Sequence, residues 1–239
     1  MRQEVWLGDC LELMKNIPDE SVDMILCDLP YGSTQNKWDV IIPFDELWKL
    51  YDEKIKKNGA IVLFSSQVFT SLLICSNIKE YKYSWVWDKV NRFSGHLNAK
   101  KQPLRITEDI CVFYKKQPIY NPQMIQGVPY KAKSSGGKST NFGNQIDGVI
   151  TINNGLYYPK NLISIKGDER GSVGRIHPTQ KPIEICEYLI KTYTNEGDLV
   201  LDNCAGSGST LVAAKNLNRQ FIGIEKEEEY YKICLERLK

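Results

Sequence analysis

The sequence predicts an α/β fold built on a doubly wound, mainly parallel sheet. Short apolar runs rich in β-branched residues recur along the chain, and they suit buried strands of a parallel sheet. Segments with helical apolar spacing separate these runs, and regular alternation of strands and helices is typical of parallel sheets. Several runs end in a carboxylate or in glycine, where open α/β sheets bind their ligands.

Length and composition limit the remaining possibilities. A chain of 239 residues can hold one α/β domain with an inserted lobe, and its net charge of +2 favours no class of partner. Its apolar runs are too short to span a membrane, and the first residues show no secretory signal. Seven scattered cysteines and two histidines lack the spacing of metal ligands, so we expect a cytoplasmic protein with reduced thiols and no metal.

Residues 1–116 are predicted to form the first half of the domain. Its expected strands cover residues 5–7, 22–27, 60–64, 83–87 and 106–114. Asp9 follows the first strand, where it could cap a short amphipathic segment or accept hydrogen bonds from a ligand. Two longer helices are expected over residues 44–57, ending at Asn58-Gly59, and over residues 67–78.

The strand over residues 22–27 runs into Asp28-Leu29-Pro30-Tyr31, which we interpret as a binding site for a planar group that carries an amine. Pro30 keeps Leu29 extended, so the Leu29 carbonyl has a fixed direction. This carbonyl and the Asp28 carboxylate could accept two hydrogen bonds from an amino group on a flat heterocycle, while the ring stacks on Tyr31. The alternative is a loop in which Asp28 caps the next element and Tyr31 packs.

Residues 117–175 are predicted to be an irregular insertion, because helical periodicity largely fails there. A basic segment overlaps its start, since residues 89–138 carry ten Lys and Arg residues against two acidic ones. Aromatic residues and a Ser/Gly/Asn-rich stretch over residues 134–144 are interleaved with these charges. This combination favours a polyanion-binding surface over an ordinary solvated face.

Residues 176–239 are predicted to complete the same domain. A helix begins near Pro182, a strand over residues 199–201 runs into a glycine-rich turn, and a second strand ends at Glu225. Helices are expected over residues 211–217 and 227–238, which completes the layout of a nucleoside-binding βαβ unit. Because the third glycine of a dinucleotide fingerprint and a phosphate-binding loop are both missing, S-adenosylmethionine is the expected cofactor, with Glu225 placed to take two ribose hydroxyls.

Together these motifs resemble those of the amino-group DNA methyltransferases. Leu201-Asp202 with Ala205-Gly206-Ser207-Gly208 is similar to their cofactor motif, and Asp28-Leu29-Pro30-Tyr31 to their Asp-Pro-Pro-Tyr catalytic motif. The catalytic motif comes first, as in the circularly permuted β-class. Further similarities lie in residues 8–11, 87–89, 110–115, 177–182 and 223–225.

The resemblance implies a Rossmann-like S-adenosylmethionine-dependent methyltransferase, with residues 117–175 as its target-recognition region. Double-stranded DNA is the implied substrate, and a homodimer and a place in a restriction–modification system are also implied. The implied catalytic residues are Asp28, Leu29, Pro30 and Tyr31. The implied cofactor-binding residues are Asp9, Cys10, Asp28, Lys181, Asp202, Asn203, Cys204, Ala205, Gly206, Ser207, Gly208, Glu225 and Lys226.

Within that set, Asp9 and Glu225 would hold the adenine and the ribose of the cofactor, and Lys181 would lie near its methionine end. Two positions depart from the family pattern. Leu29 replaces a proline but keeps the backbone carbonyl, so function should survive. Asn203-Cys204 replaces Pro-Phe, and we expect a change in cofactor affinity or in the shape of the pocket.

The expected reaction is methyl transfer to the exocyclic N6 of an adenine flipped out of the duplex and stacked on Tyr31. Asp28 and the Leu29 carbonyl would each accept one N–H, so that the nitrogen lone pair points at the methyl group. An aspartate at the first position of the motif favours adenine, by analogy with the family. The alternatives are an N4-cytosine methyltransferase, an RNA or protein-glutamine methyltransferase, and a catalytically silent nucleic-acid-binding module.

Overall fold

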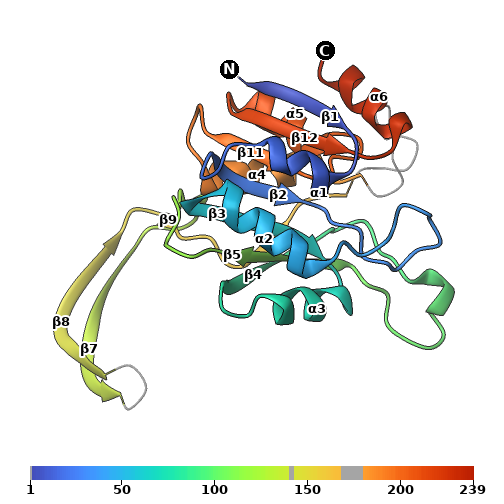
Figure 1. The fold of residues 1–239 in the computed structure, drawn as a ribbon. Coiled ribbons are helices and arrows are strands. Elements are labelled where there is room, and N and C mark those ends of the chain that lie inside the picture. The colour runs from blue at the N-terminus through green and yellow to red at the C-terminus, as the bar shows by residue number, and fades with distance from the viewer. Residues whose placement is uncertain (1, 140–142, 168–179) are drawn as a thin grey trace. The chain divides into compact units, whose positions relative to one another are not determined.

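The computed structural model describes residues 2–139, 143–167 and 180–239 (Figure 1). It divides into two compact units, of which the first comprises Met1–Asn121 with Asn161–Lys239 and the second Pro122–Lys160. In the part of the chain that is described, no helix has the length and apolar character needed to cross a membrane.

The first unit is organised around an eight-stranded sheet. Its strands lie in the order β1 (Gln3–Leu7), β12 (Gln220–Glu225), β11 (Leu199–Asp202), β2 (Val22–Cys27), β3 (Ile55–Ser65), β5 (Thr107–Phe113), β4 (Tyr81–Asp88) and β10 (Leu162–Ser164). Neighbours run parallel except at β5, which is antiparallel to both β3 and β4. The order reverses between β11 and β2, and ligands bind at such a switch point in open α/β sheets. The predicted doubly wound, mainly parallel fold is confirmed.

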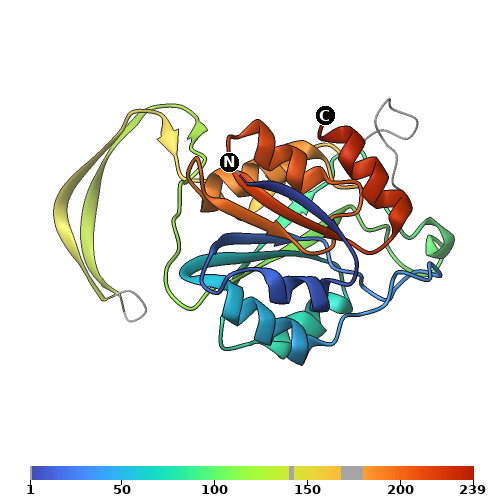
Figure 2. The same cartoon turned by 45° about the horizontal axis from the view of Figure 1, so that its top comes forward.

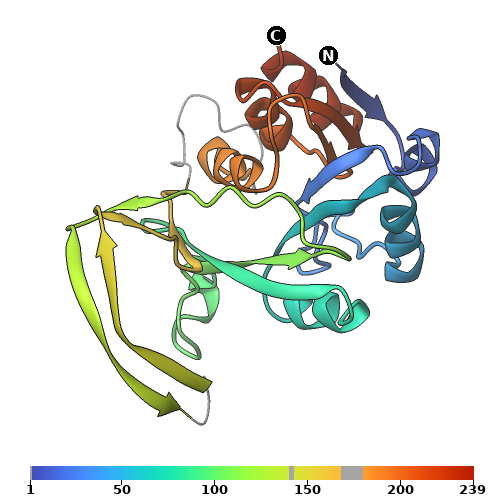
Figure 3. The same cartoon turned by 90° about the vertical axis from the view of Figure 1, so that its left-hand side faces the viewer.

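Helices cover both faces of this sheet (Figure 3). One face packs against α1 (Cys10–Leu13), the short helix η1 (Met14–Asn16), α2 (Phe44–Lys54) and α3 (Phe69–Ser76). The other packs against α4 (Ile183–Tyr193), α5 (Ser209–Asn216) and α6 (Glu228–Arg237). Alternate residues of β2 therefore enter different cores, with Ile25 and Cys27 in the first and Met24 and Leu26 in the second.

One predicted boundary is wrong. The helix expected over residues 44–57 ends at Lys54, and Asn58-Gly59 lies inside β3. Ile55 continues the apolar helical spacing in the sequence, but its β-branched side chain is buried in the sheet, where it pairs with Val22. The sheet pairing therefore ends the helix one turn before the Asn-Gly signal.

A glycine on a strand explains why the glycine-rich turn lacks a third glycine. A side chain at Gly223 of β12 would collide with Leu211 of α5. The glycine that lets helix and strand approach closely therefore lies on the strand and not in the turn. Within the turn, Gly208 has φ of +81°, and a Cβ there would meet the Sγ of Cys234. This turn therefore requires glycine at position 208.

The second unit contains paired strands. β7 (Tyr130–Ser139) and β8 (Gly143–Asn153) form a long antiparallel ladder, and β6 (Ile125–Gln126) pairs with β9 (Leu156–Tyr157). Regular strands were not expected within residues 117–175. Most described side chains of β7 and β8 are exposed, so these strands lack the apolar–polar alternation by which a half-buried strand is recognised.

The predicted insertion and the second unit differ in extent. Residues 117–121 and 161–167 belong to the first unit, where β10 pairs with β4. Residues 140–142 and 168–175 of the predicted insertion lie outside the described residues. Its role in target recognition stays a prediction.

Candidate active site

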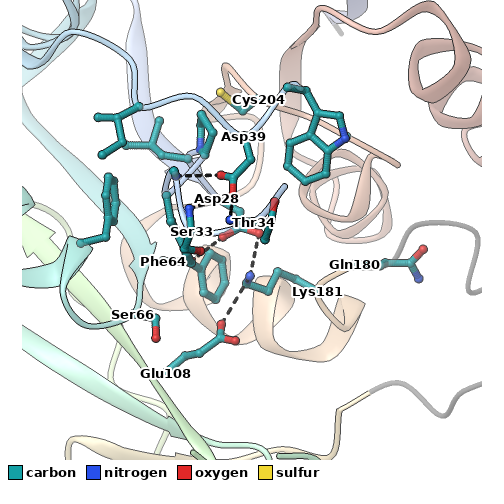
Figure 4. Close-up of a pocket in the computed structure, with 18 of the residues that line it drawn as sticks. Asp28, Ser33, Thr34, Asp39, Phe64, Ser66, Glu108, Gln180, Lys181 and Cys204 are labelled. Atoms are coloured by element: carbon teal, nitrogen blue, oxygen red, sulfur yellow. Dashed lines mark hydrogen bonds and ion pairs between the residues drawn. The ribbon is translucent and has the colours of Figure 1, made fainter. Parts of the chain in front are cut away.

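A cavity of about 1380 Å³ lies at the carboxyl ends of the parallel strands (Figure 4). It brings together every predicted site residue except Gly208, which starts α5 behind the turn. The lining residues among those predicted are Asp9, Cys10, Asp28, Leu29, Pro30, Tyr31, Lys181, Asp202, Asn203, Cys204, Ala205, Gly206, Ser207, Glu225 and Lys226. Residues far apart in the sequence therefore meet at one site.

Asp28, directly after β2, is held by two side chains. Lys181 Nζ donates to Asp28 Oδ2 at 2.6 Å, and the Tyr31 hydroxyl donates to Asp28 Oδ1 at 2.7 Å. Burial raises the pKa of the Asp28 carboxyl above its ordinary value, while the Lys181 ammonium opposes that effect. The carboxylate is thus held in position through both of its oxygens.

Lys181 connects two carboxylates in the cavity (Figure 4). Its Nζ lies 3.4 Å from Glu108 Oε2, and Lys89 Nζ lies 2.7 Å from Glu108 Oε1. Burial disfavours the ammonium, but Asp28 and Glu108 outweigh it and raise the pKa of Lys181. Burial likewise disfavours the Glu108 carboxylate, but Lys181 and Lys89 together lower its pKa below the ordinary value. The two lysines and the two carboxylates thus form one connected set of ion pairs.

The Tyr31 ring is already packed on one side. It stacks on Phe69 with ring centroids 4.9 Å apart and an interplanar angle of 26°. Lys181 Nζ lies 5.9 Å from the same ring and 5.1 Å from that of Phe64. The ring has a fixed orientation at the cavity wall, and its stacking on a target base stays a prediction.

Glu225, at the end of β12, organises the glycine turn. Its Oε2 accepts a hydrogen bond from the Gly206 backbone at 2.6 Å, and its Oε1 accepts one from the Glu227 backbone at 2.8 Å. Burial raises the pKa of this carboxyl, while the backbone donors oppose that effect. Gly206 has φ of +52°, and a Cβ there would meet no atom within 4 Å. The turn thus leaves open space above a carboxylate.

Asp9 performs the capping role that was one of its two predicted alternatives. Its Oδ1 accepts from the Leu11 backbone at 2.9 Å, and Lys226 Nζ lies 3.2 Å from its Oδ2. Asp9 also lines the cavity, beside Glu225 on the neighbouring strand end. Two carboxylates on adjacent strands, an open glycine turn and a large cavity fit a hydroxyl-rich nucleoside such as S-adenosylmethionine.

The residues after β11 show how the chain accommodates the change from Pro-Phe. The Tyr51 hydroxyl donates to Asn203 Oδ1 at 2.6 Å, so this buried amide has a partner. The Cys204 side chain lines the cavity, and its backbone N–H donates to Asp202 Oδ1 at 3.1 Å. Burial raises the pKa of Asp202 to about 7.

Two carboxylates that line the cavity and shape the site, Asp39 and Glu108, were not predicted. Asp39 accepts hydrogen bonds from the backbone of Gly32 at 2.9 Å, of Ser33 at 2.9 Å and of Thr34 at 2.7 Å, and so shapes the loop that follows Tyr31 (Figure 4). Glu108 anchors Lys181, as described above. The only signal for Glu108 was a carboxylate at the start of an apolar strand, which by itself indicates a solvated residue.

Part of the predicted motif over residues 177–182 is beyond the described chain. His177, Pro178 and Thr179 lie outside the described residues, whereas Gln180 Oε1 accepts a hydrogen bond from Ser207 Oγ at 3.2 Å. Where side chains are described, no group of three or more His, Cys, Asp or Glu residues could hold a metal ion.

A doubly wound sheet whose switch point carries a cavity lined by Asp9, Asp28 and Glu225 is the arrangement of an enzyme with a nucleoside cofactor, such as a methyltransferase. The family model for DNA methylases that act on N6 or N4 matches residues 22–236, and the chain belongs to this family. Membership confirms the predicted class of enzyme, a DNA methyltransferase that uses S-adenosylmethionine. Asp28 and the glycine-rich turn both lie within the matched residues.

Individual relatives match over almost the whole chain. The Type II methyltransferase M2.DpnII of Streptococcus pneumoniae is 54% identical, with 97% of this chain and 87% of the relative covered. The DNA adenine methyltransferase YhdJ of Escherichia coli strain K12 is 30% identical, with 97% and 81% covered. The crystal structure of the M1.HpyAVI complex with S-adenosylmethionine is 27% identical with a TM-score of 0.64, with 99% of this chain and 98% of that chain covered.

Proposed function

We propose that the protein methylates the exocyclic N6 of adenine in double-stranded DNA. The observation that carries the proposal is the fixed Asp28 carboxylate beside the Leu29 carbonyl, in the same cavity as the cofactor turn. The 30% identical relative YhdJ is named a DNA adenine methyltransferase, which supports adenine as the base. The Type II relatives support a role in restriction–modification.

The residues of the chain would position the amine and not activate it by covalent chemistry. Asp28 accepts one amine N–H and the Leu29 carbonyl accepts the other, which directs the nitrogen lone pair away from both acceptors. Lys181 favours the ionised form of Asp28, and Tyr31 would supply a ring face for the base. The proton released from the amine would leave by way of Asp28 or solvent.

The cofactor residues would hold S-adenosylmethionine without any metal. Asp9 and Glu225 would accept hydrogen bonds from its hydroxyl and amino groups. The turn from Ala205 to Ser207 would let the cofactor lie close to the backbone. When bound, S-adenosylmethionine supplies an electrophilic methyl group. These residue roles are proposals that follow from where the side chains lie.

Sequencing of modified bases tests the proposal directly. The protein is expressed in cells whose own DNA methylation genes are deleted, and the DNA is read for N6-methyladenine and N4-methylcytosine. We expect N6-methyladenine within one short recognition sequence, absent from cells that express Asp28→Ala. N4-methylcytosine would overturn the choice of adenine, and unmodified DNA would contradict the activity. The homodimer and the cytoplasmic location expected from the sequence stay predictions.

A further inference from the structure

The loop between β4 and β5 presents an apolar side chain at its tip. Leu97 lies in a single-turn helix, η2 (His96–Asn98), and is 89% exposed. Among the described residues no other large apolar side chain reaches that exposed fraction. A single exposed leucine is ordinary on a protein surface, so its meaning depends on what surrounds it.

The loop is held in one conformation by local hydrogen bonds. Ser94 and Arg105 exchange backbone hydrogen bonds of 2.9 and 3.0 Å, which close the loop at its base. The Asn98 backbone donates to the Gly95 carbonyl at 2.9 Å, which shapes the tip. The Arg105 guanidinium donates to Ser66 Oγ at 3.0 Å and thereby ties the loop to the segment after β3. Leu97 is therefore presented by an ordered loop.

The base of this loop belongs to the active-site cavity. Phe93, Ser94, His96 and Arg105 line the same cavity as Asp28. The loop, green in Figures 1 and 2, projects from the same edge of the sheet as the blue loop that follows β2. A base that reaches Asp28 therefore enters beside the residues that carry Leu97.

The charges of the loop fit a nucleic acid. Residues 89–106 contain Lys89, Arg92, Lys100, Lys101 and Arg105 and no acidic residue. Lys100 and Lys101 are exposed and lie three and four positions after Leu97. Exposed cations suit backbone phosphates, and an exposed apolar side chain near them suits the stacked bases, which apolar wedge residues enter in other DNA-binding proteins.

We propose that Leu97 enters the base stack at the target pair and fills the space left by the flipped adenine, while Lys100 and Lys101 bind the flanking phosphates. The inference rests on the proposed function, since it assumes a base in duplex DNA as substrate. Extruding a paired base is unfavourable, and the cost is smallest for a base that is mismatched or single-stranded. A wedge therefore matters only where the target base is paired and stacked.

Single-turnover methylation with three substrates tests this role. They are a duplex carrying a sequence that the wild-type protein methylates, the same duplex with an abasic site opposite the target base, and the single strand. We expect Leu97→Ala to lose about tenfold or more in rate on the paired duplex and to approach wild type on the other two. Leu97→Met keeps an apolar side chain of similar volume and should retain most of the duplex rate. Ile78→Ala, at a 66% exposed position that does not line the cavity, is the matched control and should match wild type throughout.

Fluorescence gives a second measurement that does not depend on turnover. With 2-aminopurine at the target position, binding of the wild type should raise the emission as the base leaves the stack, and Leu97→Ala should show a smaller rise. An unchanged duplex rate in Leu97→Ala, or an equal loss on all three substrates, would overturn the wedge role. Failure to find any DNA sequence in which the wild-type protein methylates adenine would instead contradict the proposed function.

Discussion

Lys181 Nζ lies 2.6 Å from Asp28 Oδ2, although the two residues are 153 positions apart in the sequence. The resemblance to known methyltransferases placed Lys181 near the methionine end of the cofactor. In the structure its nearest charged partners are the carboxylates of Asp28 and Glu108, and its position relative to the cofactor stays a prediction. We therefore propose that Lys181 positions the Asp28 carboxylate, and this role differs measurably from cofactor binding.

Replacing Lys181 should shift the pH dependence of methyl transfer. Burial raises the pKa of Asp28 and Lys181 opposes it, so in Lys181→Met the pKa of Asp28 rises further. The carboxylate must be ionised to accept the amine proton. As the pH is lowered, Lys181→Met should therefore lose activity at a higher pH than the wild type does. The rate should drop by about tenfold for each pKa unit by which Asp28 then exceeds the assay pH.

A pH–rate profile under single-turnover conditions checks this, with Lys181→Arg as the variant that keeps the charge. An unchanged profile together with weakened S-adenosylmethionine binding would support the cofactor role of Lys181 in place of the positioning role.

Asp28→Ala should lose activity without losing the cofactor. The substitution removes one preorganised acceptor, which typically costs ~2.7–4 kcal/mol or about 10²–10³-fold in rate. Asp28→Asn keeps an oxygen of similar reach and should lose less. Single-turnover transfer measured beside cofactor titration separates the two effects. A wild-type rate in Asp28→Ala would show that Asp28 only packs in its loop.

Glu225→Ala should weaken cofactor binding and leave DNA binding unchanged. The carboxylate fixes the Gly206 and Glu227 backbone and lies at the cavity wall, so its loss removes both an acceptor and the support of the turn. Hydrogen bonds to a charged group contribute ~1.5–3 kcal/mol each, which corresponds to at least about tenfold in Kd. Calorimetric titration with S-adenosylmethionine measures the change, and Glu227→Ala, which keeps the backbone donor, is the control. Equal Kd values for Glu225→Ala and the wild type would show that Glu225 does not contribute to cofactor binding.

Asp202→Asn should stabilise the protein at alkaline pH. Burial raises the pKa of Asp202 to about 7, whereas an unfolded aspartate titrates near pH ~3.9. Between these values the folded protein holds a proton that the unfolded chain has released, so the free energy of unfolding falls as the pH rises through this window. Above it the neutral amide should gain up to ~4 kcal/mol relative to wild type, at about 1.36 kcal/mol per pKa unit. Urea unfolding at acidic and alkaline pH checks the sign, and a larger gain at acidic pH would contradict it.

Local patterns predicted the strands outside residues 117–175 and the carboxylates at their ends, because strand length, apolar runs and turn residues are all local properties. Helix α2 was extended too far, because the apolar spacing at Ile55 fits both helix and strand, and only the pairing with Val22 decides between them. Glu108 and Asp39 were missed for a different reason. Glu108 pairs with Lys181, and Asp39 accepts hydrogen bonds from three backbone N–H groups. In the sequence, carboxylates with such partners cannot be distinguished from solvated ones.

The strand order has a consequence for the synthesis of the protein. β2 lies between β3 and β11, and β1 pairs with β12. During synthesis, β1 and β2 therefore stay without these partners until β11 and β12 have been made. At about 5–20 residues per second, that wait lasts roughly ten seconds or more, during which apolar strand edges stay uncovered. A nascent chain on the ribosome therefore has Asp28 but no cofactor site. Newly made protein should be unable to modify DNA before β11 and β12 have been synthesised and have joined the sheet.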